Sequence, residues 1–480
     1  MVIKVHDLYE NPLITRYASK EMARCFSDER KFQTWRKLWV ALAEAEKELG
    51  LPITQQQIDE LKAHQCDINY EVAEAKEREV RHDVMAHIHA YGEQCPTAKA
   101  IIHLGATSCY VGDNADILQC IDALKLTEKK LVSIMSRLAS FAMEHRALPT
   151  LAFTHYQPAQ LTTVGKRASL WLQEFHMDYG ALKNTQNQIR LLGVKGTTGT
   201  QASFMTLFNE DEEIVKALED KVTAKLGVPS CFPVSGQTYP RKLDTFILQT
   251  LENIAQSAYK LAGDVRLLQN LKEIEEPFEK SQIGSSAMAY KRNPMRSERI
   301  CSLARFVMSL STNTLMTAST QWFERTLDDS ANRRLVIPQA FLAIDGVLNL
   351  CLNIMDGLVV YPKIIDSHIS AELPFMATET ILMEAVKQGG DRQALHERIR
   401  VHSMEAARQV KEQGKPNDLI DRIAGDEAFK LTQSQIGTLL NPVYFTGRAS
   451  SQVAEYIRDE IMPILDAYGA DTQMKSDVHV

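Results

Sequence analysis

Two adjacent serines and a nearby lysine are the residues of this sequence best suited to chemistry, and they lie between Gly284 and Pro294 in the segment GSSAMAYKRNP. Ser285 and Ser286 follow a glycine, so backbone N–H groups can surround their hydroxyls, and Lys291 adds a positive charge nearby. Such a set of donors stabilises an anion. A polar segment between helical patterns is either a linker or a functional loop, and these groups favour a functional loop.

A cluster of basic and acidic residues lies at Arg81, His82 and Asp83, and His87 and His89 follow it closely. Several histidines so close together in the sequence could form a metal site. Neither H-E-x-x-H nor a Cys/His pattern of zinc spacing is present, however. We therefore favour the edge of a cationic, hydrogen-bonding pocket.

Two further histidines stand beside hydroxyl or loop residues. His103 lies in IIHLGATS, where Thr107 and Ser108 can cap a following helix, and capping alone is a sufficient reason for both hydroxyls. His155 lies in FTHYQPAQ, just before Pro158, and we expect a loop-to-helix transition there. A lone histidine is most often a satisfied polar group, so its catalytic role needs other support.

Two other segments could hold an anion. GVKGTTGTQASF, from Gly193, lacks the G-x-x-x-x-G-K-[ST] pattern of a nucleotide phosphate loop and follows no expected strand, but it could still cradle an anion. FERTLDDSANRR carries Arg325, Arg333 and Arg334 around a polar turn. Such a run is either a solvated helix face with ion pairs or a clamp for phosphate or carboxylate.

Length and charge set the broad class of the protein. A chain of 480 residues exceeds what one hydrophobic core usually holds, so two or three domains are expected. Lys and Arg number 54 against 61 Asp and Glu, a net charge of −7. This balance argues against a general nucleic-acid or membrane-surface binder, while local basic pockets remain compatible with it.

Cysteine use and hydropathy indicate the compartment. The eight cysteines contain no C-x-x-C pair, which is typical of reduced thiols inside the cell. The first residues, MVIKVHDLYENP, lack the apolar core of a signal peptide. The most hydrophobic region, 335–360, is interrupted by Pro338, Asp345 and Asp356, so no membrane span is expected. A cytoplasmic protein is predicted.

Helical periodicity dominates the chain, and strand signals are nearly absent. Long periodic segments cover 124–141, 165–192, 246–271, 297–323 and 335–359. Five such segments predict an all-α bundle. Helices this long usually have apolar faces too wide for one chain to bury, so a homo-oligomer is expected.

Shorter helices flank the long ones and predict three domains. The N-terminal helical domain spans 1–111, with prolines between its helices. The central bundle and oligomerisation domain spans 112–364. The C-terminal domain spans 365–480, where helical patterns shorten again before a Gly/Pro/Asn break at 414–417.

The serine loop resembles that of the fumarase/aspartase superfamily, whose pattern is close to GSSxMPxKxNP. RHDVMAH, HLGATS, THYQPAQ, KGTTGTQASF, RTLDDSANRR and ELPFMATE, in that order, are similar to the adenylosuccinate lyase family in particular. The resemblance runs from about Arg16 to Arg448. Ala289 departs from it, because the family usually has proline at this position.

The resemblance implies an all-α enzyme of three domains that assembles as a homotetramer, with active sites shared between subunits. The implied substrates are adenylosuccinate, cleaved to AMP, and SAICAR, cleaved to AICAR, with fumarate released from each. The resemblance implies no metal and no organic cofactor, and no nucleic-acid or membrane partner.

The resemblance also assigns roles in the elimination. Ser285 would be the base, its alkoxide stabilised by Lys291 and loop amides, and His155 would be the acid that protonates the departing nitrogen. Glu298 matches the family's histidine-orienting carboxylate and would favour the imidazolium. His82 matches another active-site histidine.

The remaining matches would bind substrate. They are Arg16, Tyr17, Arg81, His82, Asp83, His103, Thr107, Ser108, Gln237, Ser286, Asn293, Arg299, Arg325, Ser330 and Arg334. Arginines suit a phosphate dianion because the guanidinium fork pairs with two oxygens at once.

Two alternatives stay open. Another fumarate-releasing member of the superfamily, such as argininosuccinate lyase, shares the loop, but the arginines of RTLDDSANRR favour a phosphorylated substrate. A non-catalytic helical scaffold would have no use for Ser285, Lys291 and Asn293.

Overall fold

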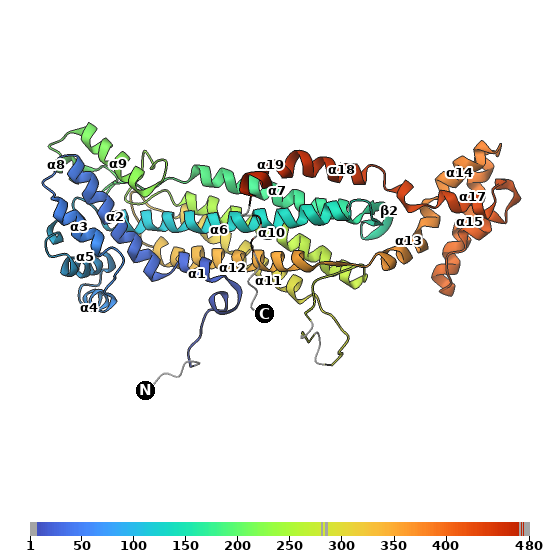
Figure 1. Ribbon diagram of the computed structural model, residues 1–480, viewed down its shortest axis with the longest axis horizontal. Helices are drawn as coiled ribbons and strands as arrows, with labels where there is room; N and C mark the ends of the chain where they lie inside the picture. Colours follow the sequence, from blue (N-terminus) through green and yellow to red (C-terminus); the bar gives the residue numbers. More distant parts are fainter. Residues whose placement is uncertain (1–6, 280–281, 284–286, 470–471, 473, 475–480) are drawn as a thin grey trace.

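The computed structural model describes the chain except residues 1–6, 280–281, 284–286, 470–471, 473 and 475–480. The described chain is mostly helical, with two short two-stranded sheets. It forms an elongated molecule whose middle is a bundle of long helices (Figure 1). The predicted all-α class is confirmed.

Long helices form the centre of the molecule: α6 (Ser108–Glu144), α7 (Val164–Gln188), α10 (Lys242–Asn270), α11 (Met295–Ser319) and α12 (Asp329–Gly357). Apolar residues recur at helical spacing along them, so each helix can bury one face against its neighbours. All of them contribute to one hydrophobic core, for example through Leu131, Leu172, Leu251, Ile300 and Ile344. The expected bundle is therefore confirmed.

Helix α12 is the most apolar of these elements. By length and composition it is the only helix among the described residues that could cross a membrane, yet 83% of its apolar window is buried inside the protein. Asp345 on this helix is fully buried. Its carboxylate accepts hydrogen bonds from Lys130 Nζ and, at 2.7 Å, from the backbone N–H of Ser19. Helix α12 thus serves as a core helix that also anchors the N-terminal segment.

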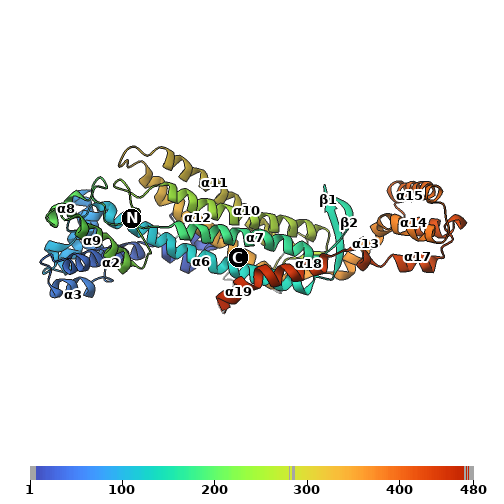
Figure 2. The ribbon, with the colours of Figure 1, turned by 90° about the horizontal axis from the view of Figure 1, so that it is seen from above.

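Shorter helices cover one end of the bundle (Figure 2). They are α2 (Asp28–Glu48), α3 (Gln55–Ala63), α4 (Tyr70–Val80), α5 (Asp83–Gln94), the 3₁₀ turn η2 (Lys99–Ile101), α8 (Ala202–Leu207) and α9 (Glu212–Leu226). The π-helical turn η1 (Leu13–Tyr17) and α1 (Lys20–Cys25) lie along α12 and α6. Helix α9 packs on α2, where Glu48 pairs with Lys221 at 2.8 Å and Lys225 at 2.7 Å.

A β-hairpin projects from the other end of the bundle (Figures 1 and 2). Strands β1 (Pro149–Thr154) and β2 (Gln157–Thr163) pair antiparallel, with Thr154 opposite Gln157. The expectation of a loop-to-helix transition at His155 is therefore wrong. A second small sheet, of β3 (Ile274–Glu275) and β4 (Val359–Val360), joins the chain after α10 to the chain after α12.

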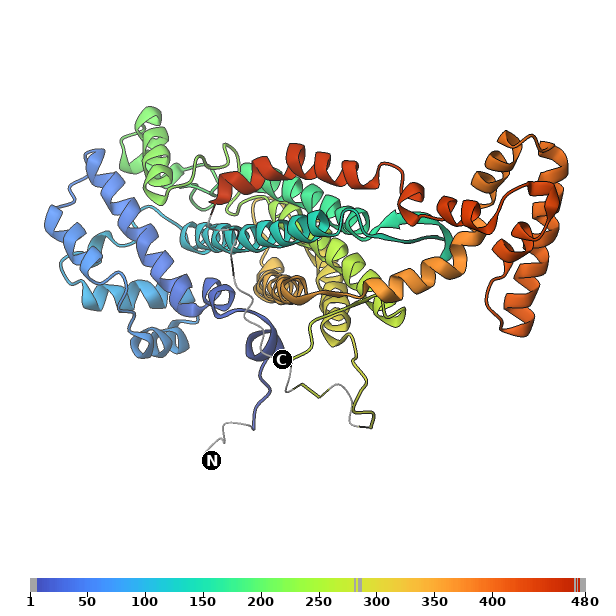
Figure 3. The ribbon, with the colours of Figure 1, turned by 45° about the vertical axis from the view of Figure 1, so that its right-hand side comes forward.

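The C-terminal part forms a separate small core and then returns to the bundle. Ala377, Leu395, Leu419 and Ile436 belong to this core. Helices α18 and α19 lie back along the bundle, in contact with α7 and α6 (red in Figure 3). The elements are α13 (Pro362–Met376), α14 (Thr378–Lys387), α15 (Arg392–Gln413), α16 (Leu419–Ala424), η3 (Glu427–Phe429), α17 (Gln433–Leu439), η4 (Pro442–Phe445), α18 (Ala449–Tyr456), η5 (Ile457–Ile461) and α19 (Met462–Tyr468).

Candidate active site

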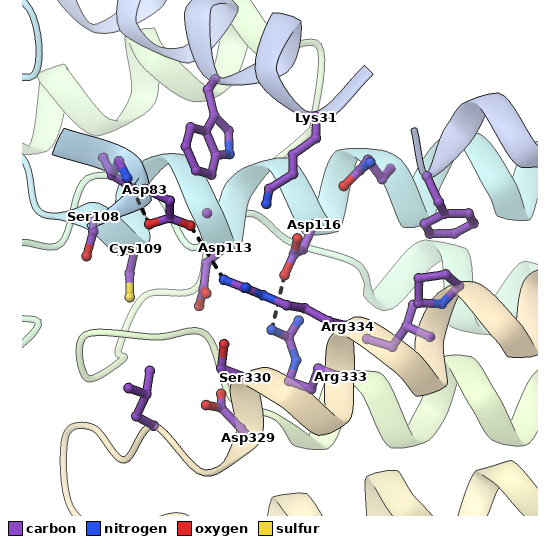
Figure 4. A pocket seen from close by; sticks show the side chains of 18 of the residues that line it. Lys31, Asp83, Ser108, Cys109, Asp113, Asp116, Asp329, Ser330, Arg333 and Arg334 are labelled. Atoms are coloured by element: carbon purple, nitrogen blue, oxygen red, sulfur yellow. Dashed lines mark hydrogen bonds and ion pairs between the residues drawn. The ribbon is translucent and has the colours of Figure 1, made fainter. Parts of the chain in front are cut away.

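A cavity of about 740 Å³ lies between α2, the start of α5 and the N-terminal ends of α6 and α12 (Figure 4). Asp83 and Arg334 meet across it, although they stand 251 positions apart in the sequence. Seven of the predicted site residues line this cavity: Arg81, His82, Asp83, Ser108, Arg325, Ser330 and Arg334.

The N-terminal end of α6 supplies hydrogen-bond donors to the cavity. Ser108 is the first residue of this helix and lines the cavity, and Thr107 is its N-cap. The Thr107 hydroxyl makes no capping hydrogen bond, so it is available to a ligand. The first N–H groups of a helix lack partners within the helix, and its dipole is positive at this end. The position therefore suits an anionic group of a substrate.

His82 and His103 lie near each other beside the cavity. His82 is the N-cap of α5, and its Nδ1 accepts a hydrogen bond from the backbone N–H of Met85 at 3.3 Å. His103 is not a lining residue. Its burial, and then the nearby charge of His82, lowers the pKa of His103 to about 4. His103 is therefore neutral near pH 7, when it can donate a hydrogen bond but carries no charge.

The three arginines of the segment RTLDDSANRR have different surroundings. Arg325 pairs with Asp329 at 3.0 Å, and Arg334, two-thirds exposed, reaches Asp83 at 3.5 Å. Arg333 is 6% exposed and is held by Asp116 at 3.1 Å and by other buried partners. Arg333 also lines the cavity, but Asp116 and Asp244 hold its guanidinium, so a clamp of all three arginines stays a prediction. Arg325 and Arg334 remain as cations that face the cavity.

A buried chain of charges underlies Arg325. Arg241 donates two hydrogen bonds to Asp113, at 3.0 and 3.1 Å, and one to Asp329 at 2.6 Å. Asp329 also accepts from Arg325. These partners come from α6, α12 and the residue before α10, so three helices are locked at one corner of the cavity. Sequence reasoning missed Arg241 and Asp113, because each stands alone in its segment without a motif.

Lys31 was also missed. It lines the cavity from α2, and its ammonium nitrogen lies 5.0 Å from the Trp35 ring centroid. No pattern in the sequence distinguishes it from the other lysines on amphipathic helices.

A second group of predicted residues lies elsewhere in the chain. Arg16 and Tyr17 belong to η1, and the guanidinium of Arg299 lies 5.8 Å from the Tyr17 ring centroid. Glu298 is an exposed residue in the first turn of α11. None of these four lines the cavity.

The serine loop leads into α11. Ser285 and Ser286 lie outside the described residues. Lys291 is exposed, and Asn293 lies two residues before Met295, the first residue of α11.

Ala289, the residue that departs from the family pattern, lies in a hydrogen-bonded turn within this loop. The backbone N–H of Lys291 donates to the carbonyl of Met288 at 3.0 Å. Ala289 is therefore the second residue of a four-residue turn, which is the position that proline favours.

His155 occupies the tip of the hairpin. His155 and Tyr156 are the two turn residues, and both have positive φ, 53° and 58°. Two-residue hairpins need this backbone because it matches the strand twist, and it usually selects Asn or Gly. A histidine held in this conformation is a local strain of the kind found at functional sites. No hydrogen bond links His155 with Glu298 among the described residues.

The length of α6 separates His155 from the cavity. This helix has 37 residues, so at about 1.5 Å per residue it is roughly 55 Å long. Ser108 begins the helix and the hairpin follows its other end. Strand β1 has six residues, and a strand of that length returns at most roughly 20 Å. The structure therefore does not bring His155 and the cavity of one chain together.

The glycine-rich segment after Gly193 borders the cavity indirectly. Lys195 is 3% exposed and pairs with Glu219 at 2.7 Å, so its charge does not face a ligand. Gln237 donates to the carbonyl of Thr197 at 3.0 Å and accepts a hydrogen bond from the thiol of Cys109, a lining residue. Gln237 thus lies behind the cavity wall.

Taken together, the described residues supply two complementary sets of groups. The cavity gathers cations, hydroxyls and helix N–H groups that suit a phosphorylated anion. The loop and the hairpin carry the groups that could move protons, and the length of α6 keeps His155 of the hairpin away from the cavity of the same chain.

Comparison with known proteins agrees with this arrangement. A lyase family model matches residues 17–309, and a model of the adenylosuccinate lyase C-terminus matches residues 374–456. The chain is 54% identical to adenylosuccinate lyase from Saccharomyces cerevisiae, covering 98% of this chain and 99% of the relative. It is 52% identical to adenylosuccinate lyase from Schizosaccharomyces pombe, with the same coverage.

Solved structures share the fold. A fumarate lyase from Mesorhizobium sp. BNC1 superposes with a TM-score of 0.78 at 22% identity, over 94% of this chain and 100% of that one. A 3-carboxy-cis,cis-muconate lactonizing enzyme from Pseudomonas putida gives 0.79 at 21% identity, over 94% and 99%. With relatives more than half identical over nearly their whole length, this chain belongs to the adenylosuccinate lyase family of the fumarase/aspartase superfamily.

Proposed function

We propose that this chain catalyses the β-elimination of fumarate from adenylosuccinate, giving AMP, and from SAICAR, giving AICAR. The observation that carries the proposal is the cavity at the start of α6, where Arg81, Arg325 and Arg334 gather on a chain of net charge −7. Carboxylates line the same cavity and pair with these arginines, as Asp329 does with Arg325 and Asp83 with Arg334, so the arginines are held in place to meet a small polyanion. The identity to relatives named adenylosuccinate lyase supports the substrate.

The reaction breaks a C–H bond and a C–N bond and forms the double bond of fumarate. In our proposal Ser285 takes the proton beside a carboxylate of the succinyl group, and His155 returns a proton to the departing nitrogen. A serine hydroxyl is a weak base unless its alkoxide is stabilised, and Lys291 supplies the charge for this. Glu298 stabilises the imidazolium form of His155, which is the form that can act as an acid.

Charge that develops on the carboxylate during the reaction needs preorganised donors. Thr107 and Ser108 at the start of α6 are suited to this task, together with Lys291 and Asn293 from the loop. The nucleotide is bound by the remaining predicted residues: Arg16, Tyr17, Arg81, His82, Asp83, His103, Gln237, Ser286, Arg299, Arg325, Ser330 and Arg334.

The working enzyme is, in our proposal, a homotetramer whose active sites combine residues of different subunits. The length of α6 supports this, because it keeps His155 of one chain away from the cavity of the same chain. Exposed apolar side chains on the long helices, such as Leu170, Met177, Leu267 and Met316, support contacts between subunits.

The three-domain division at 1–111, 112–364 and 365–480 remains part of the proposal, as does a cytoplasmic location. The separate small core around Ile381 and Ile436 supports the third domain. All eight cysteines are free thiols, which supports a reducing compartment.

An ultraviolet assay of the purified full-length protein tests the function. We expect cleavage of adenylosuccinate and of SAICAR, with formation of fumarate, and no cleavage of argininosuccinate. Turnover of argininosuccinate in place of both ribonucleotides would assign the chain to a different reaction of the superfamily. Absence of turnover on all three substrates would favour a scaffold.

A further inference from the structure

A buried tryptophan contacts His103 on the side away from solvent. The indole Nε1–H of Trp39, in the middle of α2, donates a hydrogen bond to His103 Nδ1 at 2.9 Å. The two rings meet edge to face, with centroids 6.0 Å apart and planes at 87°. Trp39 itself is 1% exposed and packs against Trp35 and Tyr91. The indole is therefore fixed before any ligand arrives.

The chemistry of the indole determines the state of the imidazole. An indole N–H can only donate, so the His103 Nδ1 that receives it must carry a lone pair and no proton. The single proton of a neutral imidazole is then on Nε2. Nε2 makes no hydrogen bond with any described residue, so its N–H is available to a ligand.

The backbone holds the ring in the same place. His103 has a positive φ of 67°, a left-handed conformation that few non-glycine residues adopt, although histidine does so more often than most. Its carbonyl accepts the backbone N–H of Ala106 at 3.2 Å, which closes a turn just before Thr107 and α6. His103 thus reaches the start of α6 from a fixed turn, and Trp39 fixes its ring.

We propose that Trp39 is a positioning residue that holds His103 as the neutral Nε2–H tautomer, so that His103 serves the substrate as a fixed hydrogen-bond donor and not as an acid or base. This inference rests on the proposed function, because the substrate-binding role of His103 is part of it. Trp39 touches no substrate and acts through His103 alone.

The Nδ1 of His82 also accepts a hydrogen bond, but from a backbone N–H. Its Nδ1 accepts the backbone N–H of Met85 at 3.3 Å, so its Nε2 also carries the proton in the neutral state. His103 and His82 are close enough for the charge of one to lower the pKa of the other. Two neighbouring histidines with fixed Nδ1 acceptors would present two N–H donors to one anionic group.

The electrostatic surroundings keep His103 neutral. Burial is the first cause that lowers its pKa, to about 4, and the charge of His82 at the start of α5 is the second. The other neighbouring elements present uncharged groups: α2 presents Trp39, and α8 presents Phe204 and Leu207 against Gly105. His103 should therefore stay neutral between pH 5.5 and pH 8.

Neutron diffraction on crystals of the full-length protein exchanged into heavy water tests the tautomer without any substrate. We expect deuterium on His103 Nε2 and none on Nδ1. Deuterium on Nδ1 would overturn the proposal whatever the enzyme's activity is.

Kinetics of Trp39→Phe test the consequence, because phenylalanine keeps a buried aromatic ring while it removes the indole donor and part of the ring volume. We expect KM for adenylosuccinate at pH 8 to rise roughly threefold to tenfold, as for one lost hydrogen bond, with kcat nearly unchanged. Burial still keeps the pKa of His103 low in this variant, so the rise in KM should be much the same at pH 6 as at pH 8.

Trp171→Phe is the matched control. Trp171 is buried in α7 and donates its indole N–H to Asp264 at 2.7 Å, so the same substitution removes the same kind of hydrogen bond elsewhere in the bundle. We expect it to lower stability without a change in KM. An equal rise of KM in both variants would show a general effect of packing and overturn the proposal.

A double-mutant cycle with His103→Gln keeps the proposal testable if Trp39→Phe is unstable. The glutamine amide can place an N–H near the position of Nε2 but offers no acceptor near Nδ1. If Trp39 acts through His103, adding Trp39→Phe to His103→Gln changes KM no further. Additive losses would contradict the proposal. A wild-type KM for His103→Gln in an active enzyme would remove His103 from substrate binding, while the proposed reaction would stand.

Discussion

Burial changes the acid–base properties of several single side chains in this protein, and Glu46 is one of them. It is fully buried in α2, and neither carboxylate oxygen has a hydrogen-bond partner among the described residues. Burial raises its pKa from an ordinary value near 4.5 to about 9. The folded protein therefore holds a proton on Glu46 at neutral pH, while the unfolded chain does not.

This difference predicts a pH-dependent gain of stability in Glu46→Met. Between pH 4.5 and about 9 the folded state binds more protons at this site than the unfolded state, so wild-type stability falls as pH rises through that window. Methionine has no ionisable group, so Glu46→Met removes the cost of burying this carboxyl group. We expect a gain on the order of 3 kcal/mol at pH 7 and none at pH 4, measured by denaturant unfolding.

Glu48→Met is the control on the same helix. Hydrogen bonds from Lys221 and Lys225 lower the pKa of Glu48 to about 2. Its contribution to stability is therefore present above the unfolded pKa and is lost as pH falls toward 2. Glu48→Met should give no gain at any pH, and a gain equal to that of Glu46→Met would contradict the argument from burial.

The turn in the serine loop gives a second prediction at this scale. Ala289→Pro places proline at the second position of the turn closed by Met288 and Lys291, where its fixed φ fits. Proline restricts the conformations of the loop in the free enzyme, so less entropy is lost when substrate binds. KM for adenylosuccinate should therefore fall roughly twofold to fivefold.

Tyr290→Pro moves the proline to the third position of the turn, where it is disfavoured. This variant should raise KM. An Ala289→Pro enzyme with unchanged or weaker affinity would show that the freedom of this loop does not limit binding.

Motifs made the candidate site residues predictable from the sequence. The residues that hold them in place were not predictable. His82, Ser108 and Arg334 stand in recognisable segments. Trp39 and Arg241 are single residues with ordinary helical neighbours, and each acts on a residue far away in the sequence. Such roles follow from packing and carry no local signal.

At the scale of elements, Arg241 joins α6 and α12 at the corner of the cavity. Its guanidinium satisfies Asp113 and Asp329, and Asp329 in turn holds Arg325. Arg241 is 4% exposed, so removing it leaves Asp113 buried without its cation and Asp329 with Arg325 as its remaining cation. Breaking a buried pair in this way is strongly destabilising.

Arg241→Met should therefore lower the free energy of unfolding by roughly 3–5 kcal/mol, and it should raise KM because Arg325 loses its fixed partner. Denaturant unfolding and steady-state kinetics measure the two effects. Lys216→Met is the comparison, since Lys216 pairs with Glu213 on the exposed surface of α9. Equal losses in both variants would mean that the buried network has no special role.

The long helices were predictable because their apolar periodicity extends over many turns. The β-hairpin was not. Its turn is formed by His155 and Tyr156 in a backbone conformation that usually selects glycine or asparagine, so no turn signal marked it. The strands are six and seven residues long, too short to outweigh the helical patterns around them.

At the scale of the whole molecule, the bundle sets the distance between the groups that must react. Helix α6 carries Ser108 at one end and leads to the hairpin of His155 at the other. The returning helices α18 and α19 add contacts along the same bundle (Figure 3). A single chain therefore holds His155 away from its own cavity, and in the proposed enzyme residues of several chains combine to complete each site.

Complementation between two inactive variants tests this account most directly. Ser285→Ala removes the proposed base and His155→Ala the proposed acid, so each homomeric protein should have almost no turnover. Mixed tetramers should contain some sites with both residues intact. If the two residues of a site come from different subunits, an equal mixture should regain up to about a quarter of wild-type activity. Tetramers shown to exchange subunits but still lacking activity would contradict sites shared between chains.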